Sequence, residues 1–132
     1  MEEITIQVGL PGGQSVDAVV DDKLIHTDQP VKDGGDDSGP SPFDLFLGSI
    51  ATCAGYYALA FCQRRKIPTD NLRLTVKCIP DESKKRLGRI VTEIAPPPDF
   101  PEKYKAALVR AVDLCTVKKH IVAPPEFDVQ IV

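Results

Sequence analysis

Cysteine is the residue type with which this sequence could do covalent chemistry. Four cysteines occur among 132 residues, at positions 53, 62, 78 and 115. Cys53 stands in the middle of an uncharged run and is flanked by glycine, alanine, serine and threonine, so a small molecule could approach its thiol. A thiol becomes a nucleophile where a cation or a helix N-terminus favours the thiolate. Cys53 is therefore either reactive or, as is commonest for a free cysteine, a small buried apolar residue.

The other three cysteines carry weaker indications. Cys115 lies on the apolar stripe of a second predicted helix, where it could meet Cys53 if the helices pack together, and core packing is an equally good interpretation. Cys62 precedes two arginines, although packing at a helix end is favoured, and Cys78 fits a strand core. Cys53 and Cys62 are nine residues apart on one helix, about 13 Å along its axis, so they cannot form a disulfide.

Other common kinds of site are missing from the sequence. There are two histidines, His26 and His120, and no Cys-x-x-Cys motif, which argues against zinc. His120, near a predicted helix end, is interpreted as a surface or capping residue. No glycine-rich phosphate loop joins a strand to a helix, and no serine stands in a nucleophile-elbow context. We therefore expect neither a metal nor a cofactor.

The stretch 41–65 predicts one long helix around which the chain is organised. Ser41 suits the N-cap, Pro42 the first helical position and Asp44 the acidic place of a capping box. No charged residue occurs between Leu45 and Cys62, and the apolar side chains fall all round the helix, which is typical of a buried helix. Such a rod, about 35 Å long, is hard to cover within one small chain, so the sequence favours a pair of chains that cover each other's helix.

Composition favours a soluble protein with a single domain spanning residues 1–132. The chain is 42% hydrophobic and 27% charged, with a net charge of −3, which gives no reason to expect nucleic acid or an anionic membrane as partner. The uncharged run is long enough to consider a membrane span, but its glycine, serine and threonine content and the need for a core argue against one. Reduced cysteines without a disulfide pattern indicate a cytoplasmic protein.

The remaining pattern is that of an antiparallel α+β protein. Strands are predicted at 4–8, 15–20 and 24–26, then a polar loop at 29–40 that leads into the long helix. Two strands at 72–78 and 89–95 follow, then a helix capped by Asp99 and running to about His120, and a last strand at 127–132. The predicted order is βββ-α-ββ-α-β.

The segment Gly39-Pro40-Ser41-Pro42-Phe43-Asp44-Leu45, with Cys53 eleven residues after Pro42, resembles the OsmC/Ohr family of osmotically induced and organic-hydroperoxide-resistance proteins. The resemblance extends over nearly the whole chain and includes the run 110–114 in the second helix. It implies an intertwined homodimer around the two long helices. It also implies a thiol peroxidase in which Cys53 attacks an organic hydroperoxide, a second cysteine closes a disulfide, and a dithiol reduces that disulfide.

Three positions depart from the family pattern. Phe43 occupies the place of the carboxylate that accompanies the reactive cysteine, with Asp44 one residue later. No arginine precedes Arg64, and His120 stands at the usual place of the second cysteine, which leaves Cys115 as the candidate partner. The first hypothesis is a peroxidase whose site residues are Cys53, Cys115 and Asp44. The alternative, which the departures favour, is an OsmC-like protein that binds a small apolar ligand or senses redox state without turnover.

Overall fold

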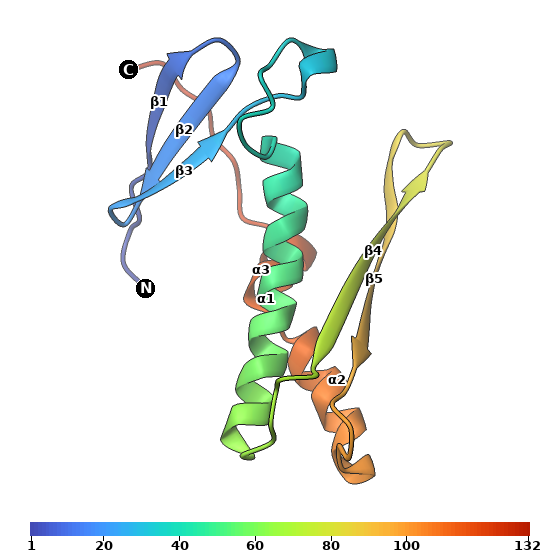
Figure 1. Cartoon of the computed structure of the whole chain (residues 1–132). Helices are drawn as coiled ribbons and strands as arrows, with labels where there is room; N and C mark the ends of the chain where they lie inside the picture. Colours follow the sequence, from blue (N-terminus) through green and yellow to red (C-terminus); the bar gives the residue numbers. More distant parts are fainter. The chain divides into compact units, whose positions relative to one another are not determined.

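The computed structural model describes all 132 residues, and the chain forms two compact units (Figure 1). The first unit spans residues 1–48 and the second spans residues 49–132, so the boundary falls within the long helix. The elements are α-helices and antiparallel strands, which confirms the α+β class. That the chain folds as one domain stays a prediction.

Three antiparallel strands make up the sheet of the first unit, in the order β1-β2-β3. They are β1 (Gln7–Gly12), β2 (Ser15–Val20) and β3 (Lys23–Thr27). The predicted meander is confirmed, although β1 begins later than expected and continues through Pro11. The turn between β2 and β3 places Asp21 and Asp22 in the left-handed region, with φ of 49° and 61°, a conformation that aspartate tolerates better than most residues.

A buried carboxylate organises the loop that follows β3. Asp28 is 1% exposed, and its oxygens accept hydrogen bonds from the backbone N–H groups of Gln29 (2.7 Å), Asp36 (3.2 Å) and Ser38 (3.1 Å). The Ser38 hydroxyl donates a further bond of 2.6 Å. These donors satisfy the charge of the carboxylate, and one short 3₁₀ turn, η1 (Val31–Asp33), is the only helical segment in the loop.

These hydrogen bonds predict an acid-sensitive contribution to stability. The hydroxyl of Ser38, with the backbone donors, lowers the pKa of Asp28 from 3.8 to about 2 in the folded protein. A lowered folded-state pKa stabilises above the unfolded value of 3.8, and this stabilisation is lost as the pH falls towards 2. In urea unfolding at pH 5, 4, 3 and 2, wild type should lose more stability across this window than Asp28→Asn, although the variant is less stable at pH 5. Parallel pH profiles would contradict this role.

The long helix α1 (Pro42–Arg64) has the predicted bounds. Ser41 is its cap, because the Ser41 hydroxyl accepts the N–H of Asp44 at 3.2 Å. The chain leaves the helix through Lys66, whose φ of 55° is left-handed. The helix α1 is long enough and apolar enough to cross a membrane. The core helix of a soluble protein can have the same length and composition. Its buried residues, Ile50, Ala54, Ala58, Phe61 and Cys62, follow one side of the helix.

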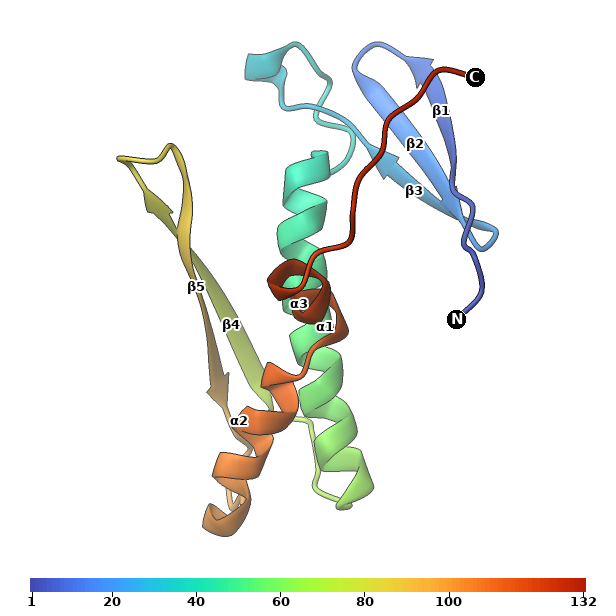
Figure 2. The ribbon, with the colours of Figure 1, turned by 180° about the vertical axis from the view of Figure 1, so that it is seen from behind.

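The second unit continues from α1 with a hairpin and two short helices (Figures 1 and 2). The hairpin pairs β4 (Arg73–Asp81) with β5 (Arg86–Ala95), both longer than predicted. A 3₁₀ turn, η2 (Glu102–Tyr104), leads into α2 (Lys105–Asp113), and α3 (Thr116–Val122) follows after a break at residues 114–115.

Two predictions about the C-terminal part are wrong. The second helix is not continuous to His120, since it breaks at Leu114 and Cys115, and Asp99 does not cap it but takes a left-handed φ of 63°. The segment predicted as a last strand has no regular structure, and Phe127, Val129 and Ile131 are almost fully exposed. A strand needs a partner for its backbone N–H and C=O groups, and no strand of this chain pairs with that segment.

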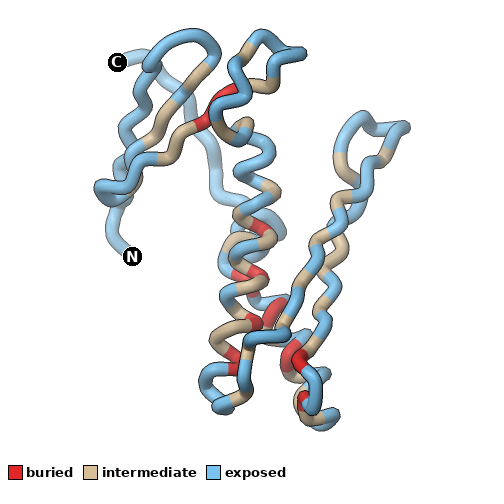
Figure 3. The backbone as a smooth tube through the Cα atoms, viewed as in Figure 1, coloured by how far each residue is buried: buried red, intermediate tan, exposed pale blue.

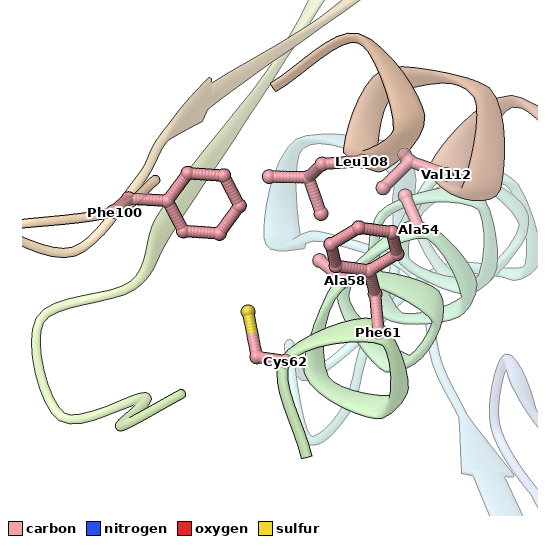
Figure 4. Packing of buried hydrophobic residues seen from close by; sticks show 7 residues of the cluster. All are labelled: Ala54, Ala58, Phe61, Cys62, Phe100, Leu108 and Val112. Carbon is pink, nitrogen blue, oxygen red and sulfur yellow. The ribbon is translucent and has the colours of Figure 1, made fainter. Parts of the chain in front are cut away.

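The core of the second unit lies between α1, α2 and the segment that precedes α2. Buried residues are concentrated on one side of α1 and on α2 (Figure 3). Leu108 and Val112 of α2 meet the α1 side chains, and Phe100 closes the cluster with its ring centroid 6.5 Å from that of Phe61 (Figure 4). The guanidinium of Arg65 stacks 3.5 Å over the Phe61 ring. The packing of α2 on α1 brings the second cysteine-bearing segment towards Cys53.

Candidate functional site

Two of the four cysteines meet in the second unit. Cys53 is half-buried on α1, Cys115 is buried, and the two thiols lie near enough to interact with each other. No disulfide is present, so both are free thiols. The predicted encounter between Cys53 and Cys115 therefore occurs in the structure. Whether the pair is catalytic stays a prediction.

Burial raises the pKa of the Cys115 thiol, and the neighbouring Cys53 thiol raises that pKa further. The N–H groups of Lys118 and Val117, in the first turn of α3, have the opposite effect. A raised pKa favours the protonated form, so Cys115 keeps its proton more readily than an exposed thiol does.

A cavity of about 290 Å³ opens beside Cys115, and Ala54, the residue after Cys53, also lines it. Its lining is contributed by α1, β5 and the two helices on either side of Cys115. Most of these side chains are apolar, and the charged ones, Asp113 and Lys118, form an ion pair with each other. The lining residues are Ile50, Ala54, Ile90, Thr92, Ile94, Val109, Val112, Asp113, Cys115 and Lys118. The cavity is therefore suited to a small apolar molecule next to a thiol.

A tyrosine joins the two cysteine-bearing segments. The hydroxyl of Tyr57 is 2.6 Å from the hydroxyl of Thr116, the residue directly after Cys115. Tyr57 is four residues after Cys53, so the two side chains lie on the same face of α1, one turn apart. Cys53 and Tyr57, one turn apart on α1, thus lie next to two successive residues of the C-terminal segment, Cys115 and Thr116.

The other predicted candidates lie away from the thiol pair. Asp44 is in the first turn of α1, nine residues before Cys53, which corresponds to about 13 Å along the axis and the opposite side of the helix. Cys62 is fully buried in the core, and burial raises its pKa while Arg65 partly offsets this. Cys78 is half-buried in β4, opposite Ile90. Packing is therefore the better interpretation of both of these cysteines.

The two histidines have local partners. The Nδ1 of His120 donates to the carbonyl of Thr116 at 2.8 Å, within α3. His26 bridges two residues of the first unit, with Nδ1 2.5 Å from the Asp17 carboxylate and Nε2 2.9 Å from the Ser38 hydroxyl. No group of histidine, cysteine and acidic side chains has the arrangement of a metal site.

The serine, histidine and aspartate of this bridge have the connectivity of a hydrolytic triad but not its proton arrangement. The Ser38 hydroxyl donates its only proton to Asp28, which is ionised because its pKa is about 2. The Nε2 of His26 must therefore donate to the Ser38 oxygen, whereas a general base would accept the serine proton. The network fixes the loop to β2 and β3 and does not activate a nucleophile.

Sequence reasoning did not single out Tyr57, Thr116 or Asp28. Tyr57 was counted among the apolar residues of the helix, and Thr116 follows a cysteine that was expected inside a helix. The spacing of Tyr57 four residues after Cys53 was the available signal, but its hydroxyl partner comes from 59 residues away. Asp28 is one acidic residue among several in a polar loop, and only its burial distinguishes it.

Fold and site together define an α+β protein with a pair of thiols between a long helix and a shorter helical segment, next to an apolar cavity. Several solved structures share this fold. An OsmC-like protein from Mycoplasma pneumoniae is 19% identical, with 93% of this chain and 89% of that chain covered and a TM-score of 0.67. A Psychrobacter arcticus protein named for the osmotic stress and detoxification response is 21% identical, with coverage of 90% and 88% and a TM-score of 0.72.

The organic hydroperoxide resistance protein OhrB of Bacillus subtilis is 21% identical, with 90% of each chain covered and a TM-score of 0.52. No curated protein is a significant sequence match. The sequence profile of OsmC-like proteins matches residues 35–130. The chain therefore belongs to the OsmC/Ohr family, which is related to organic hydroperoxide resistance, and the predicted resemblance is confirmed.

Proposed function

We propose that this protein is a thiol peroxidase that reduces organic hydroperoxides, with Cys53 as the attacking residue and Cys115 as its partner. The observation that carries the proposal is the pair of neighbouring thiols next to an apolar cavity. A pair of this kind can be oxidised by two electrons and reduced again without loss of atoms from the protein.

The proposed reaction has three steps. The Cys53 thiolate attacks the outer oxygen of the hydroperoxide ROOH, the O–O bond breaks, and the alcohol ROH leaves after taking up a proton, so that Cys53 becomes a sulfenic acid. The thiol of Cys115 then attacks the Cys53 sulfur, and water leaves with the Cys115 proton. A dithiol reductant finally restores both thiols and is itself oxidised to a disulfide. Asp44 as a site residue stays a prediction, and no metal or cofactor is needed for these steps.

The cavity supports an organic substrate rather than hydrogen peroxide. Its lining is mainly aliphatic, and its volume of about 290 Å³ suits a small apolar group. Burial of such a group stabilises the complex by about 25 cal/mol for each Å² removed from water. Hydrogen peroxide has no apolar surface and gains nothing from this lining. We expect the rate of Cys53 oxidation to be at least about tenfold higher with an organic hydroperoxide.

The test is a count of free thiols with intact mass after one equivalent of oxidant. Wild type and Cys53→Ser would each be mixed with cumene hydroperoxide or with hydrogen peroxide. Wild type should lose two thiols rapidly with cumene hydroperoxide and more slowly with hydrogen peroxide, and peptide mapping should find a disulfide between Cys53 and Cys115. Cys53→Ser should keep its three remaining thiols. An equal thiol loss in the variant, or no reaction of wild type within minutes, would refute the peroxidase.

The cavity also favours a second candidate function, the binding of a small apolar ligand without turnover. The two charged residues of the lining neutralise each other, and no further cation lines the cavity to favour a thiolate. A binding protein, or a redox sensor that is oxidised once and not recycled, would need no such activation. Saturable binding of an unreactive alkyl alcohol, together with unreactive thiols, would support this candidate over the peroxidase.

We also propose that the protein acts in the cytoplasm as a homodimer and receives electrons from a dithiol. Large apolar side chains of α1, among them Phe43 and Tyr56, are more than half exposed, as are those of the C-terminal segment. A second copy that covers these side chains would remove them from water. The free thiols are consistent with a reducing compartment. The chain is not strongly basic, so its charge gives no reason to propose a nucleic acid partner.

A further inference from the structure

We propose that Tyr57 is a positioning residue for the thiol pair, which acts through Thr116 to keep Cys115 within reach of Cys53. This inference rests on the proposed two-cysteine chemistry and assigns a role to a residue outside the thiol pair. Its basis is the arrangement of two parallel contacts, Cys53 with Cys115 and Tyr57 with Thr116, between the same two segments.

The spacing of these contacts gives them a common effect. Cys53 and Tyr57 are one helical turn apart on α1, with a rise of about 6 Å, whereas Cys115 and Thr116 are adjacent in the chain. The hydroxyl contact of 2.6 Å therefore fixes the residue next to Cys115 against a rigid helix. With Thr116 held, the Cys115 sulfur can move only by rotation and by small changes in its own backbone.

The other attachments of the segment around Cys115 are to its own neighbours in the chain. Its backbone bonds to α2 are 3.3 Å for Leu114 N to Ala111 O and 3.2 Å for Cys115 N to Val112 O. An ion pair between Asp113 and Lys118 connects α2 to α3 across it. The hydroxyl pair is therefore the side-chain hydrogen bond that connects this segment to α1 next to the thiols.

The step that depends on this position is closure of the disulfide. The sulfurs must approach to about 2 Å, and the sulfenic acid of Cys53 and the thiol of Cys115 become a disulfide and water. Every orientation of Cys115 that points elsewhere lowers the rate and the equilibrium of this step. Oxidation of Cys53 itself does not require the two sulfurs to approach each other, so it should depend much less on Tyr57 than closure does.

The experiment measures disulfide formation in Tyr57→Phe by two methods. In a buffer of reduced and oxidised glutathione, the equilibrium between the dithiol and the Cys53–Cys115 disulfide should shift about three- to tenfold towards the dithiol, the effect expected of one ordinary hydrogen bond. In a reaction with cumene hydroperoxide, closure should slow by a similar factor, while the rate of sulfenic acid formation, measured by trapping with dimedone, should change much less.

The adjacent tyrosine provides a matched control. Tyr56 is 62% exposed and its hydroxyl has no hydrogen-bond partner, so Tyr56→Phe should behave as wild type. Thr116→Val should reproduce the effect of Tyr57→Phe, whereas Thr116→Ser, which keeps the hydroxyl, should not. The double variant Tyr57→Phe/Thr116→Val should be no worse than either single variant, because both remove the same bond.

The outcomes separate this inference from the proposed function. A Tyr57→Phe protein with the wild-type disulfide equilibrium and closure rate would overturn the positioning role. Equal slowing of sulfenic acid formation and closure would also overturn it, since that result indicates general damage to the site. If wild type forms the disulfide in glutathione but ignores the hydroperoxide, the peroxidase fails while the glutathione equilibrium still decides the role of Tyr57. A wild type that forms no Cys53–Cys115 disulfide overturns both.

Discussion

A Cys115→Ser protein is expected to consume one equivalent of cumene hydroperoxide rapidly and to react only slowly after that. Its Cys53 would be oxidised to the sulfenic acid, but no sulfur would lie next to it to close a disulfide. Reduction would then depend on a thiol from solution, which lacks the high effective concentration of a neighbouring group, so turnover with a dithiol should fall by about 100-fold or more. Excess hydroperoxide should convert the Cys53 sulfenic acid, which has no partner thiol, to sulfinic acid. The added oxygen would be detected by mass spectrometry.

Cys78→Ser is the control for this experiment. Cys78 is half-buried in β4 and has no part in the thiol pair, so its loss should leave the turnover unchanged. Serine is close in size to cysteine, and neither replacement should open a cavity. A disulfide to Cys53 that still forms in Cys115→Ser, for instance with another cysteine, would show that Cys115 is not the partner.

Replacement of Gly35 by alanine is expected to destabilise the first unit by roughly 3 kcal/mol. A Cβ at this position would lie 2.0 Å from the backbone oxygen of Gln29 and 2.8 Å from a carboxylate oxygen of Asp28. Both atoms belong to the hydrogen-bonded loop, so neither can move away without breaking bonds to the buried carboxylate. The expected result is a lower midpoint in urea, followed by far-ultraviolet circular dichroism because the chain has no tryptophan.

Gly9→Ala supplies the comparison. A Cβ on Gly9 would meet no atom within 4 Å, so the change should alter stability by less than about 0.5 kcal/mol. Because the loop could open without global unfolding, amide hydrogen exchange at Asp36 and Ser38, whose N–H groups bind Asp28, should be followed as well. Unchanged exchange together with an unchanged midpoint would show that the loop accommodates a methyl group easily.

Local signals explain why much of the fold was predictable. Ser41 and Pro42 predicted the start of α1 because a capping hydroxyl and a proline at the first position act within one turn. The break after α2 was missed because the amphipathic pattern continues through Cys115, and no glycine or proline marks the interruption. The alternation from Phe127 to Ile131 predicted a strand, but alternation shows only that one face is apolar and cannot supply a partner.

The site was predictable to the extent that it depends on the helix. Cys53 was singled out from its small neighbours, and its encounter with Cys115 was a hypothesis that required α2 to pack on α1. The roles of Tyr57 and Asp28 could not be predicted in this way. Each depends on a partner that only tertiary folding brings near, and polar side chains follow no periodic pattern that would identify such partners.

The joint between α2 and α3 separates two properties that are usually linked in small enzymes. Leu108, on α2, belongs to the buried cluster that holds the unit together and does not line the cavity, whereas Cys115 lies just beyond the helix and outside that cluster. A substitution of Leu108 should therefore change mainly the resistance to denaturation, and a substitution in the joint should change mainly the chemistry of the thiols. Stability and reactivity can thus vary separately at these two places, only seven residues apart in the chain.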